Sequence, residues 1–265
     1  MRTALIARLR AAGCVFAEDE AAALSLEPDL ERRESLVRRR LGGEPLEHLL
    51  GSVWFGPLQL AVGPGVFVPR QRSLLLARLA VQRARSRRAA VVLELCCGVA
   101  PIAATVAHEL AGHLGEAAAE LHASDIDPVA LAYARRNLPA DAGVHEGDLV
   151  SALPGHLRGR VHVLAAVAPY VPAGAAHLLP PEAREHEPAR ALLGGQDGTD
   201  LLQDIARHAP GWLAPAGRVL LEMHEEQRRT VVATARGAAL CRARWHVDDG
   251  RTGVLELWRP PFARG

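Results

Sequence analysis

The stretch Val91-Val92-Leu93-Glu94-Leu95-Cys96-Cys97-Gly98 decides the fold, because an apolar strand with an internal acidic residue runs here into a turn that contains glycine. The pattern predicts a helix next, over residues 101–110. A strand, a glycine-bearing turn and a helix in this order form the nucleotide-binding corner of a doubly wound sheet. Such a turn needs glycine where the backbone approaches a ligand or adopts a positive φ. Only Gly98 remains of the usual three glycines, since Cys96 and Ala100 stand at the other positions, so the turn alone is a weak signal.

Strands and helices alternate along the chain on the C-terminal side of this corner. Apolar strands are expected at residues 89–95, 120–125, 161–166 and 217–222, and helices at residues 101–110, 128–138, 201–209 and 226–238. Residues 243–247 and 253–258 read as a closing antiparallel pair. This order builds a parallel sheet that is covered by helices, so the sequence predicts an α/β fold.

The N-terminal part follows another pattern. Apolar residues recur at helical spacing over residues 3–41, which predicts a small bundle of helices. Alternating apolar residues between glycines and prolines predict a short β-hairpin within residues 42–69. A further helix is expected over residues 73–85. We therefore expect a helical domain over residues 1–50, a hairpin connector over residues 51–72 and an α/β domain over residues 73–265.

Composition limits the class of protein. The chain has 265 residues, of which 49% are hydrophobic and 23% charged, as in an ordinary globular protein. Because no apolar run reaches the roughly 20 residues of a membrane span and the N-terminus lacks a signal-peptide pattern, we expect a cytoplasmic protein without a membrane partner. The net charge of +1 argues against a nucleic-acid partner. The chain contains no lysine, which excludes Schiff-base chemistry and a P-loop lysine.

The cysteines give no sign of a metal site. Cys14, Cys96, Cys97 and Cys241 lack the paired spacing of zinc ligands. Reduced thiols are the expectation for such a set in the cytosol. The sequence therefore predicts neither a disulfide nor a structural zinc ion.

Acidic residues follow the next two strands of the predicted sheet. Asp125 ends one of them, 27 residues beyond Gly98, where a carboxylate can accept hydrogen bonds from both hydroxyls of a ribose. The alternative is that Asp125 starts the following helix, a role that Asp127 fills better because it precedes Pro128.

The segment Glu146-Gly147-Asp148-Leu149 lies where the third strand is expected to end. Asp148 could accept a hydrogen bond from an adenine amino group while Leu149 covers the ring, and a plain surface turn is an equally good interpretation. The candidate cofactor-binding residues are Glu94, Cys96, Gly98, Asp125, Ile126, Asp148 and Leu149.

Several longer motifs extend this pattern over nearly the whole chain. They are Glu44-Pro45-Leu46-Glu47-His48-Leu49-Leu50-Gly51, Phe67-Val68-Pro69-Arg70, Asp125-Ile126-Asp127-Pro128 and Glu187-Pro188-Ala189-Arg190-Ala191-Leu192-Leu193-Gly194-Gly195-Gln196-Asp197-Gly198. Their order resembles the HemK/PrmC family, the protein-glutamine N5-methyltransferases that modify release factors, and most closely an actinobacterial PrmC-related branch. The resemblance implies a Rossmann-like class I methyltransferase domain that uses S-adenosylmethionine and releases S-adenosylhomocysteine. It also implies a helical N-terminal substrate-recognition domain and a hairpin connector.

The chain departs from this family at the residue that holds the acceptor. Val167-Ala168-Pro169-Tyr170 stands in place of the family's Asn-Pro-Pro-Tyr motif, whose Asn side chain accepts a hydrogen bond from the amide that is methylated. Valine has no acceptor, and Asn137 is the only asparagine in the chain. The acid expected after the family's Ile-Pro-Arg-Pro segment is replaced by Leu74. The resemblance therefore implies the family's fold and cofactor but not its reaction.

The candidate catalytic residues are Val167, Pro169, Tyr170, His186 and Glu222. Tyr170 can stack on a substrate or form a hydrogen bond with it. The two titratable groups are expected near the C-terminal edge of the sheet. Each also has a plainer interpretation, since Glu222 can cap its strand and a lone histidine such as His186 is more often a surface residue.

Three functions are compatible with these residues. We favour an enzyme that uses the S-adenosylmethionine pocket on a small molecule in specialised metabolism. Its reaction is methyl or alkyl transfer, or ring closure of a substrate already joined to the sulfonium with release of S-adenosylhomocysteine. The alternatives are a release-factor glutamine methyltransferase and a non-catalytic binding protein. The sequence identifies neither the acceptor, nor the catalytic base, nor the oligomeric state.

Overall fold

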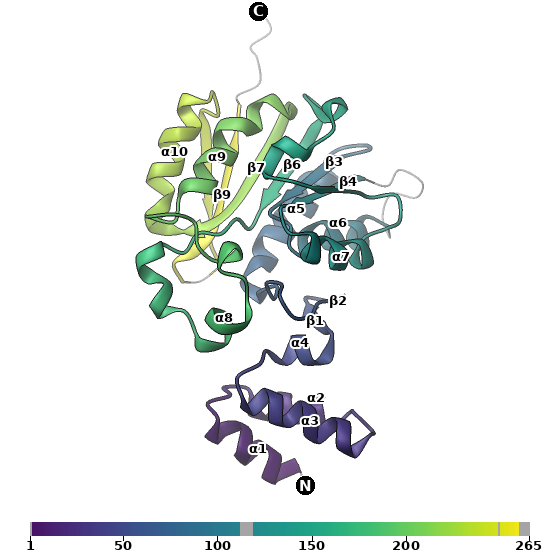
Figure 1. The fold of residues 1–265 in the computed structure, drawn as a ribbon. Helices are drawn as coiled ribbons and strands as arrows, with labels where there is room; N and C mark the ends of the chain where they lie inside the picture. The colour runs from purple at the N-terminus through teal and green to yellow at the C-terminus, as the bar shows by residue number, and fades with distance from the viewer. Residues whose placement is uncertain (1, 112–118, 249, 260–265) are drawn as a thin grey trace, which may run out of the picture.

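The computed structural model describes residues 2–111, 119–248 and 250–259. From residue 2 to residue 50, the described part of the chain has four helices, α1 (Arg2–Ala11), α2 (Ala17–Leu24), α3 (Leu30–Leu41) and α4 (Leu46–Leu50). They share a small core of their own, which includes Leu9, Leu24, Leu36 and Leu49. Figure 1 shows these helices below the main sheet, at the purple end of the chain. Helix α4 follows the residues whose spacing predicted helices, and it lies within the helical domain expected over residues 1–50.

The predicted hairpin is present but shorter than its segment. Strands β1 (Ser52–Phe55) and β2 (Leu58–Ala61) pair in antiparallel register. The side chain of Asn137 joins this hairpin to the sheet, because its Oδ1 accepts from the Ala61 amide at 2.7 Å and its Nδ2 donates to the carbonyls of Ala61 at 3.0 Å and Val99 at 2.9 Å. The chain's only asparagine therefore positions the connector.

Within the described residues, the main sheet has seven strands in the order β5-β4-β3-β6-β7-β9-β8. Their bounds are β3 (Val91–Leu95), β4 (Glu120–Asp125), β5 (Gly143–Glu146), β6 (Val161–Ala166), β7 (Leu213–His224), β8 (Arg242–His246) and β9 (Thr252–Trp258). The first five in this order are parallel, and β9 runs antiparallel to both of its neighbours. This mostly parallel sheet confirms the predicted α/β class.

Helices cover both faces of the sheet (Figure 1). One face packs against α5 (Leu74–Arg85), α6 (Pro101–Ala111) and α7 (Pro128–Asn137), and the other against α9 (Asp200–His208) and α10 (Arg228–Gly237). Strand β3 serves both cores, because Val92 faces the first and Leu93 the second. The connections from β3 and β6 lead to opposite sides of the sheet, which makes the carboxyl ends of these two central strands the expected ligand-binding crevice.

The long segment between β6 and α9 was not assigned by the sequence pattern. It contains the short helix α8 (Pro181–His186) and short 3-10 helices. Strand β7 also begins at Leu213, four residues before its predicted start. A β-strand can extend through small or polar residues when a neighbouring strand supplies hydrogen-bond partners for its backbone. The spacing of apolar residues does not reveal such an extension.

Candidate active site

A cavity of about 260 Å³ lies at the carboxyl ends of β3 and β4. We call it the first cavity. All seven residues that the sequence suggested for cofactor binding line it: Glu94, Cys96, Gly98, Asp125, Ile126, Asp148 and Leu149. The structure thus brings together residues that lie up to 55 positions apart in the chain.

The turn after β3 retains the shape of a glycine-rich turn although two glycines are missing. Cys96, Gly98 and Ala100 have φ angles of 49°, 52° and 60°. A residue with a Cβ atom pays roughly 1–2 kcal/mol in this left-handed region, so Cys96 and Ala100 hold a strained backbone. Burial raises the pKa of both Cys96 and Cys97, which keeps these thiols protonated.

Glu94 is buried at the point where β3 leads toward α6. Its carboxyl oxygens accept the amide hydrogens of Ile102 at 3.3 Å and Ala103 at 2.7 Å. Burial nevertheless raises the pKa of Glu94 to about 8. The carboxyl group therefore satisfies the free amides at the start of α6 while it faces the first cavity.

Asp125 connects the two loops that border this cavity. Its Oδ2 accepts the Gly98 amide hydrogen at 2.8 Å, and its Oδ1 accepts the Asp127 amide hydrogen at 2.9 Å. Burial raises its pKa. Asp127 caps α7 through a 2.9 Å bond from the Val129 amide, so the helix-start role belongs to Asp127. A carboxylate has about four lone-pair sites, which leaves Asp125 with acceptor capacity for a ligand.

The segment after β5 is folded back onto the end of β4. The Gly147 amide donates to the Asp125 carbonyl at 3.0 Å, and the Ser124 hydroxyl donates to the Leu149 carbonyl at 3.3 Å. These bonds place Asp148 and Leu149 on the cavity wall. Asp148 itself is exposed, so the segment is a surface turn that also borders the cavity.

A second cavity of about 320 Å³ adjoins the first. Five residues line both cavities: Phe67, Arg70, Val167, Pro169 and Ala191. Val167 and Pro169 therefore stand where the two cavities meet. Tyr170 lines the second cavity only, together with residues of α8.

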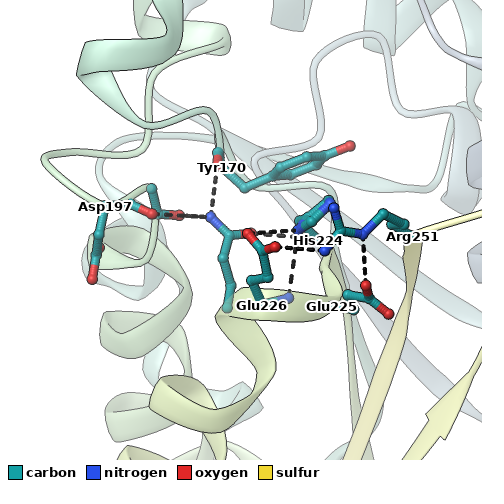
Figure 2. A network of polar contacts seen from close by, with 8 residues as sticks. Tyr170, Asp197, His224, Glu225, Glu226 and Arg251 are labelled. Carbon is teal, nitrogen blue, oxygen red and sulfur yellow. Dashed lines mark hydrogen bonds and ion pairs between the residues drawn. The ribbon is translucent and has the colours of Figure 1, made fainter.

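The loop that carries Tyr170 is fixed by residues that follow it in the chain. The Gln227 side-chain amide donates to the carbonyl of Tyr170 at 2.8 Å and to that of Gly198 at 3.0 Å. Figure 2 shows the Tyr170 carbonyl in this network and its phenol ring pointing away from it. A Cβ atom at Gly194 would lie 2.3 Å from the Pro169 carbonyl oxygen, and one at Gly198 2.2 Å from that of Tyr170.

These close approaches give the glycine-containing stretch 187–198 a physical role. The sequence showed this stretch as family-specific, but it gave no sign that its glycines pack against the 167–170 loop. Gln227 was not predicted at all. Its position after β7, next to the acidic Glu225 and Glu226, resembles an ordinary exposed helix start.

A polar group of three side chains lies beside the second cavity. The Tyr170 hydroxyl donates to Oε1 of Glu222 at 3.2 Å, and Nε of Arg72 lies 3.6 Å from the same oxygen. The Glu222 side chain is only 2% exposed, and its Oε2 has no hydrogen-bond partner in the described part of the chain. Burial, aided by the charge of Glu222, raises the pKa of Tyr170 to about 12. The phenol is therefore a hydrogen-bond donor at neutral pH.

The titratable side chains of Glu187 and His186 have other surroundings. Glu187 binds Nη2 of Arg70 at 2.7 and 2.8 Å with a side chain that is 1% exposed, so it holds the Phe67–Arg70 segment in place. His186 lines neither cavity and lies beside Gly43 of the N-terminal part. The structure does not bring His186 together with Tyr170 and Glu222.

Curated relatives match most of the chain. A release factor glutamine methyltransferase of Mycolicibacterium smegmatis is 38% identical over 204 residues, which cover 76% of this chain and 69% of the relative. The Streptomyces coelicolor protein of the same name is 34% identical, with 72% and 67% covered. A 4-amino-L-phenylalanine/4-methylamino-L-phenylalanine methyltransferase of Streptomyces pristinaespiralis is 33% identical, with 81% and 72% covered. No protein-family model matches the chain.

Solved structures support the fold. A Thermus thermophilus 16S rRNA methyltransferase in complex with AdoMet and guanosine aligns with a TM-score of 0.56 at 18% identity, covering 79% of this chain and 50% of that one. A Pyrococcus furiosus methyltransferase aligns with a TM-score of 0.51 at 14% identity, covering 87% and 99%. Within the described residues, no helix is both long and apolar enough to cross a bilayer. The fold and the extended similarity to curated relatives together place the chain in the HemK/PrmC family of S-adenosylmethionine-dependent methyltransferases.

Proposed function

We propose that this methyltransferase transfers the methyl group of S-adenosylmethionine to the nitrogen of a small aromatic amine bound in the second cavity, as a step of specialised metabolism. The observation that carries the proposal is the position of Val167. It stands at the junction of the two cavities. With the cofactor in the first cavity and the acceptor in the second, the proposed transfer takes place at this junction.

At Val167 the junction is apolar, where the family's motif has a polar side chain. Val167 offers no hydrogen-bond acceptor, and the neighbouring Ala168 is buried. A primary amide held there would leave N–H groups without the oriented side-chain partner, at a cost of roughly 1–3 kcal/mol for an unsatisfied buried group. An aromatic ring loses nothing at such a wall, so the junction favours an acceptor with an apolar body.

The rest of the second cavity has the same character. Its apolar lining consists of Phe67, Val167, Ala168, Pro169, Val171, Leu179, Pro180, Ala183, Ala191 and Leu192. Its charged groups are Arg70, Arg72 and Glu182. Arg70 is bound by Glu187, and Glu182 receives a 3.0 Å bond from Arg40. Nε of Arg72 lies 3.6 Å from Glu222, but the Arg72 side chain is 53% exposed, so its other N–H groups are available to hold a carboxylate of an amino-acid substrate.

The relative from Streptomyces pristinaespiralis supports this class of substrate. That protein is named for methyl transfer to 4-amino-L-phenylalanine, a molecule that combines an aromatic amine with an amino-acid carboxylate. Its alignment covers more of this chain than those of the two release-factor enzymes cited above. A family member can therefore act on a small amine with the same overall fold.

The first cavity is the site that we assign to the cofactor. Asp125 accepts from the ribose hydroxyls, while Asp148 and Leu149 border the adenine. When bound, S-adenosylmethionine would supply a methyl group on a positively charged sulfur, and the sulfur is the leaving group of an in-line displacement at the methyl carbon. The protein's contribution is to align acceptor nitrogen and methyl group, because such a transfer depends mainly on proximity and orientation.

Tyr170 and Glu222 form the polar edge of the proposed acceptor site. Methylation of a neutral amine yields an ammonium ion that must release one proton. Tyr170 lines the acceptor site, and its hydroxyl donates to Oε1 of the buried Glu222. This bond provides a route for the proton, because the phenol oxygen can take it up while its own hydrogen passes to the carboxylate. Glu222 is absent from the cavity lining and acts as a positioning residue through Tyr170.

The N-terminal helices brace the wall of the second cavity. Arg40 of α3 binds both oxygens of Glu20 in α2, at 2.6 and 2.9 Å, and also contacts Glu182 of α8. This buried arginine links the helical part to the helix that carries Ala183 on the cavity wall. We propose that the helical part completes a small-molecule pocket in this chain.

The test is methyl transfer from labelled S-adenosylmethionine to 4-amino-L-phenylalanine, to its analogue without the carboxylate and to a purified release factor. We expect transfer to the amino acid, and a KM at least tenfold higher for the analogue because the contact with Arg72 is lost. Val167→Asn should lower kcat/KM for the amino acid about tenfold or more, and Val247→Asn, at an exposed position, should not. The proposal fails if only the release factor is methylated, or if Val167→Asn and Val247→Asn behave alike.

A further inference from the structure

We propose that Glu120, His122 and His156 form a binding site for a divalent transition-metal ion such as Zn²⁺ at the edge of the main sheet. One ligand atom from each side chain lies within 4.8 Å of the others. Two of the three residues belong to β4 and the third to the short 3-10 helix η3 (Gly155–Leu157). None of them lines either cavity, so the cluster is separate from the proposed methyl-transfer site.

His122 is the centre of the cluster. Its Nε2 lies 3.1 Å from Oε1 of Glu120, and its Nδ1 lies 2.9 Å from Nε2 of His145. When Nδ1 donates its hydrogen to His145, the Nε2 lone pair is directed at a carboxylate oxygen. Two acceptors that face each other at this distance repel unless a proton or a cation lies between them. A metal ion satisfies both atoms at once.

The partners of these groups match the outer shell of a metal site. Metal-bound histidines commonly have their second nitrogen held by another group, and bound carboxylates are themselves hydrogen-bonded. Here His145 holds the second nitrogen of His122, and Nη2 of Arg160 binds Oε2 of Glu120 at 2.8 Å. Oε1 of Glu120 and Nε2 of His122 then remain for the ion.

The distances between the three ligand atoms fit a tetrahedrally coordinated ion once the His156 ring has turned. Ligand bonds of about 2.0–2.2 Å to zinc separate neighbouring ligand atoms by roughly 3.3 Å. The His122–Glu120 pair is already close to that separation. His156 is exposed, so its ring can turn toward the pair without disturbing the core. Imidazole and carboxylate ligands together suit zinc and similar divalent ions.

A glycine on the neighbouring strand makes room for the cluster. Gly143 of β5 pairs with His122 in the ladder. A Cβ atom at Gly143 would lie 2.3 Å from Nδ1 of His122 and 2.8 Å from Nε2 of His145. An ion bound here would join β4 to η3, and through His145 to the edge strand β5. The expectation of no metal site came from cysteine spacing, which does not detect ligands brought together from separate segments.

The test is calorimetric titration of the untagged full-length protein with Zn²⁺ alone, in a Cys241→Ser background that removes the exposed thiol. We expect one ion per chain and a thermal midpoint that rises with zinc. Glu120→Gln and His156→Ala should each weaken binding by 10-fold to 100-fold or more and abolish the thermal shift. His208→Ala, at another exposed histidine, is the matched control and should change neither.

His156 is exposed and Glu120 is partly exposed at the start of β4, so folded variants are expected. Circular dichroism of each variant checks this before titration. The proposal is wrong if zinc does not bind saturably, or if Glu120→Gln and His156→Ala bind it as tightly as the parent protein. It is equally wrong if His208→Ala weakens binding as much as they do.

Discussion

Replacement of Asp125 by alanine tests the proposed cofactor site at its most connected residue. In the structure, each carboxylate oxygen of Asp125 accepts one backbone amide, from Gly98 at 2.8 Å and from Asp127 at 2.9 Å. The remaining acceptor sites are those that we assign to the two ribose hydroxyls. The substitution therefore removes both the ligand contacts and the bonds that hold the Cys96–Ala100 turn in its left-handed conformation.

The magnitude follows from these bonds. A hydrogen bond to a charged group contributes about 1.5–3 kcal/mol, and two lost ribose contacts at the lower value amount to roughly 3 kcal/mol. At about 1.4 kcal/mol for each factor of ten, the dissociation constant for S-adenosylhomocysteine should rise on the order of 100-fold. Asp125→Asn keeps one oxygen acceptor and should give a smaller loss.

Isothermal titration with S-adenosylhomocysteine measures the change directly, and Asp141→Ala provides an exposed acidic control. Unfolding in urea shows whether Asp125→Ala remains folded at the titration temperature. An unchanged dissociation constant in a folded Asp125→Ala variant would refute the assignment of the ribose to this carboxylate. A loss in Asp141→Ala as large as that in Asp125→Ala would show that the effect is not specific to the cavity.

Two further substitutions test other parts of the site. Burial raises the pKa of Glu94 to about 8, so the folded state binds the Glu94 proton more tightly than the unfolded state does. The protonated carboxyl group therefore contributes fully to the free energy of unfolding below pH 4.5, and this contribution declines as the pH rises toward 8. In urea unfolding from pH 5 to pH 8, wild type should lose on the order of a few kcal/mol relative to Glu94→Gln, whereas parallel curves would contradict the raised pKa. Gln227→Ala leaves the Tyr170 and Gly198 carbonyls without their donor, and should cost on the order of 2 kcal/mol of unfolding free energy and raise the KM of the amine substrate. Equal effects of Gln227→Ala and of Gln82→Ala, at an exposed position of α5, would argue against a fixed loop.

The sequence predicted the parts of this protein that depend on local pattern. The alternation of apolar strands and helices was enough for the parallel sheet, and Asp127-Pro128 separated the helix cap from the neighbouring Asp125. The order of the motifs along the chain was enough to identify the family. In each case, neighbouring residues along the chain contain the information, as expected for periodicity and capping signals.

The remaining features depend on contacts between distant segments. Gln227 binds the carbonyl of Tyr170, 57 residues earlier in the chain, and nothing in its own neighbourhood distinguishes it from a surface glutamine. The positive φ angles of Cys96 and Ala100 contradict the local preference of both residues and are maintained by the surrounding fold. The raised pKa of Glu94 similarly follows from burial, which only the assembled sheet and helix α6 provide.

The most direct test of the central claim is methyl transfer to a purified release factor that carries its unmodified glutamine. Because Val167 supplies no acceptor for the amide at the junction of the two cavities, we predict no transfer above the rate without enzyme, while 4-amino-L-phenylalanine is methylated under the same conditions. Methylation of the release factor at about one turnover per second or faster would contradict the account, because it would show that this chain holds and alkylates an amide without the asparagine.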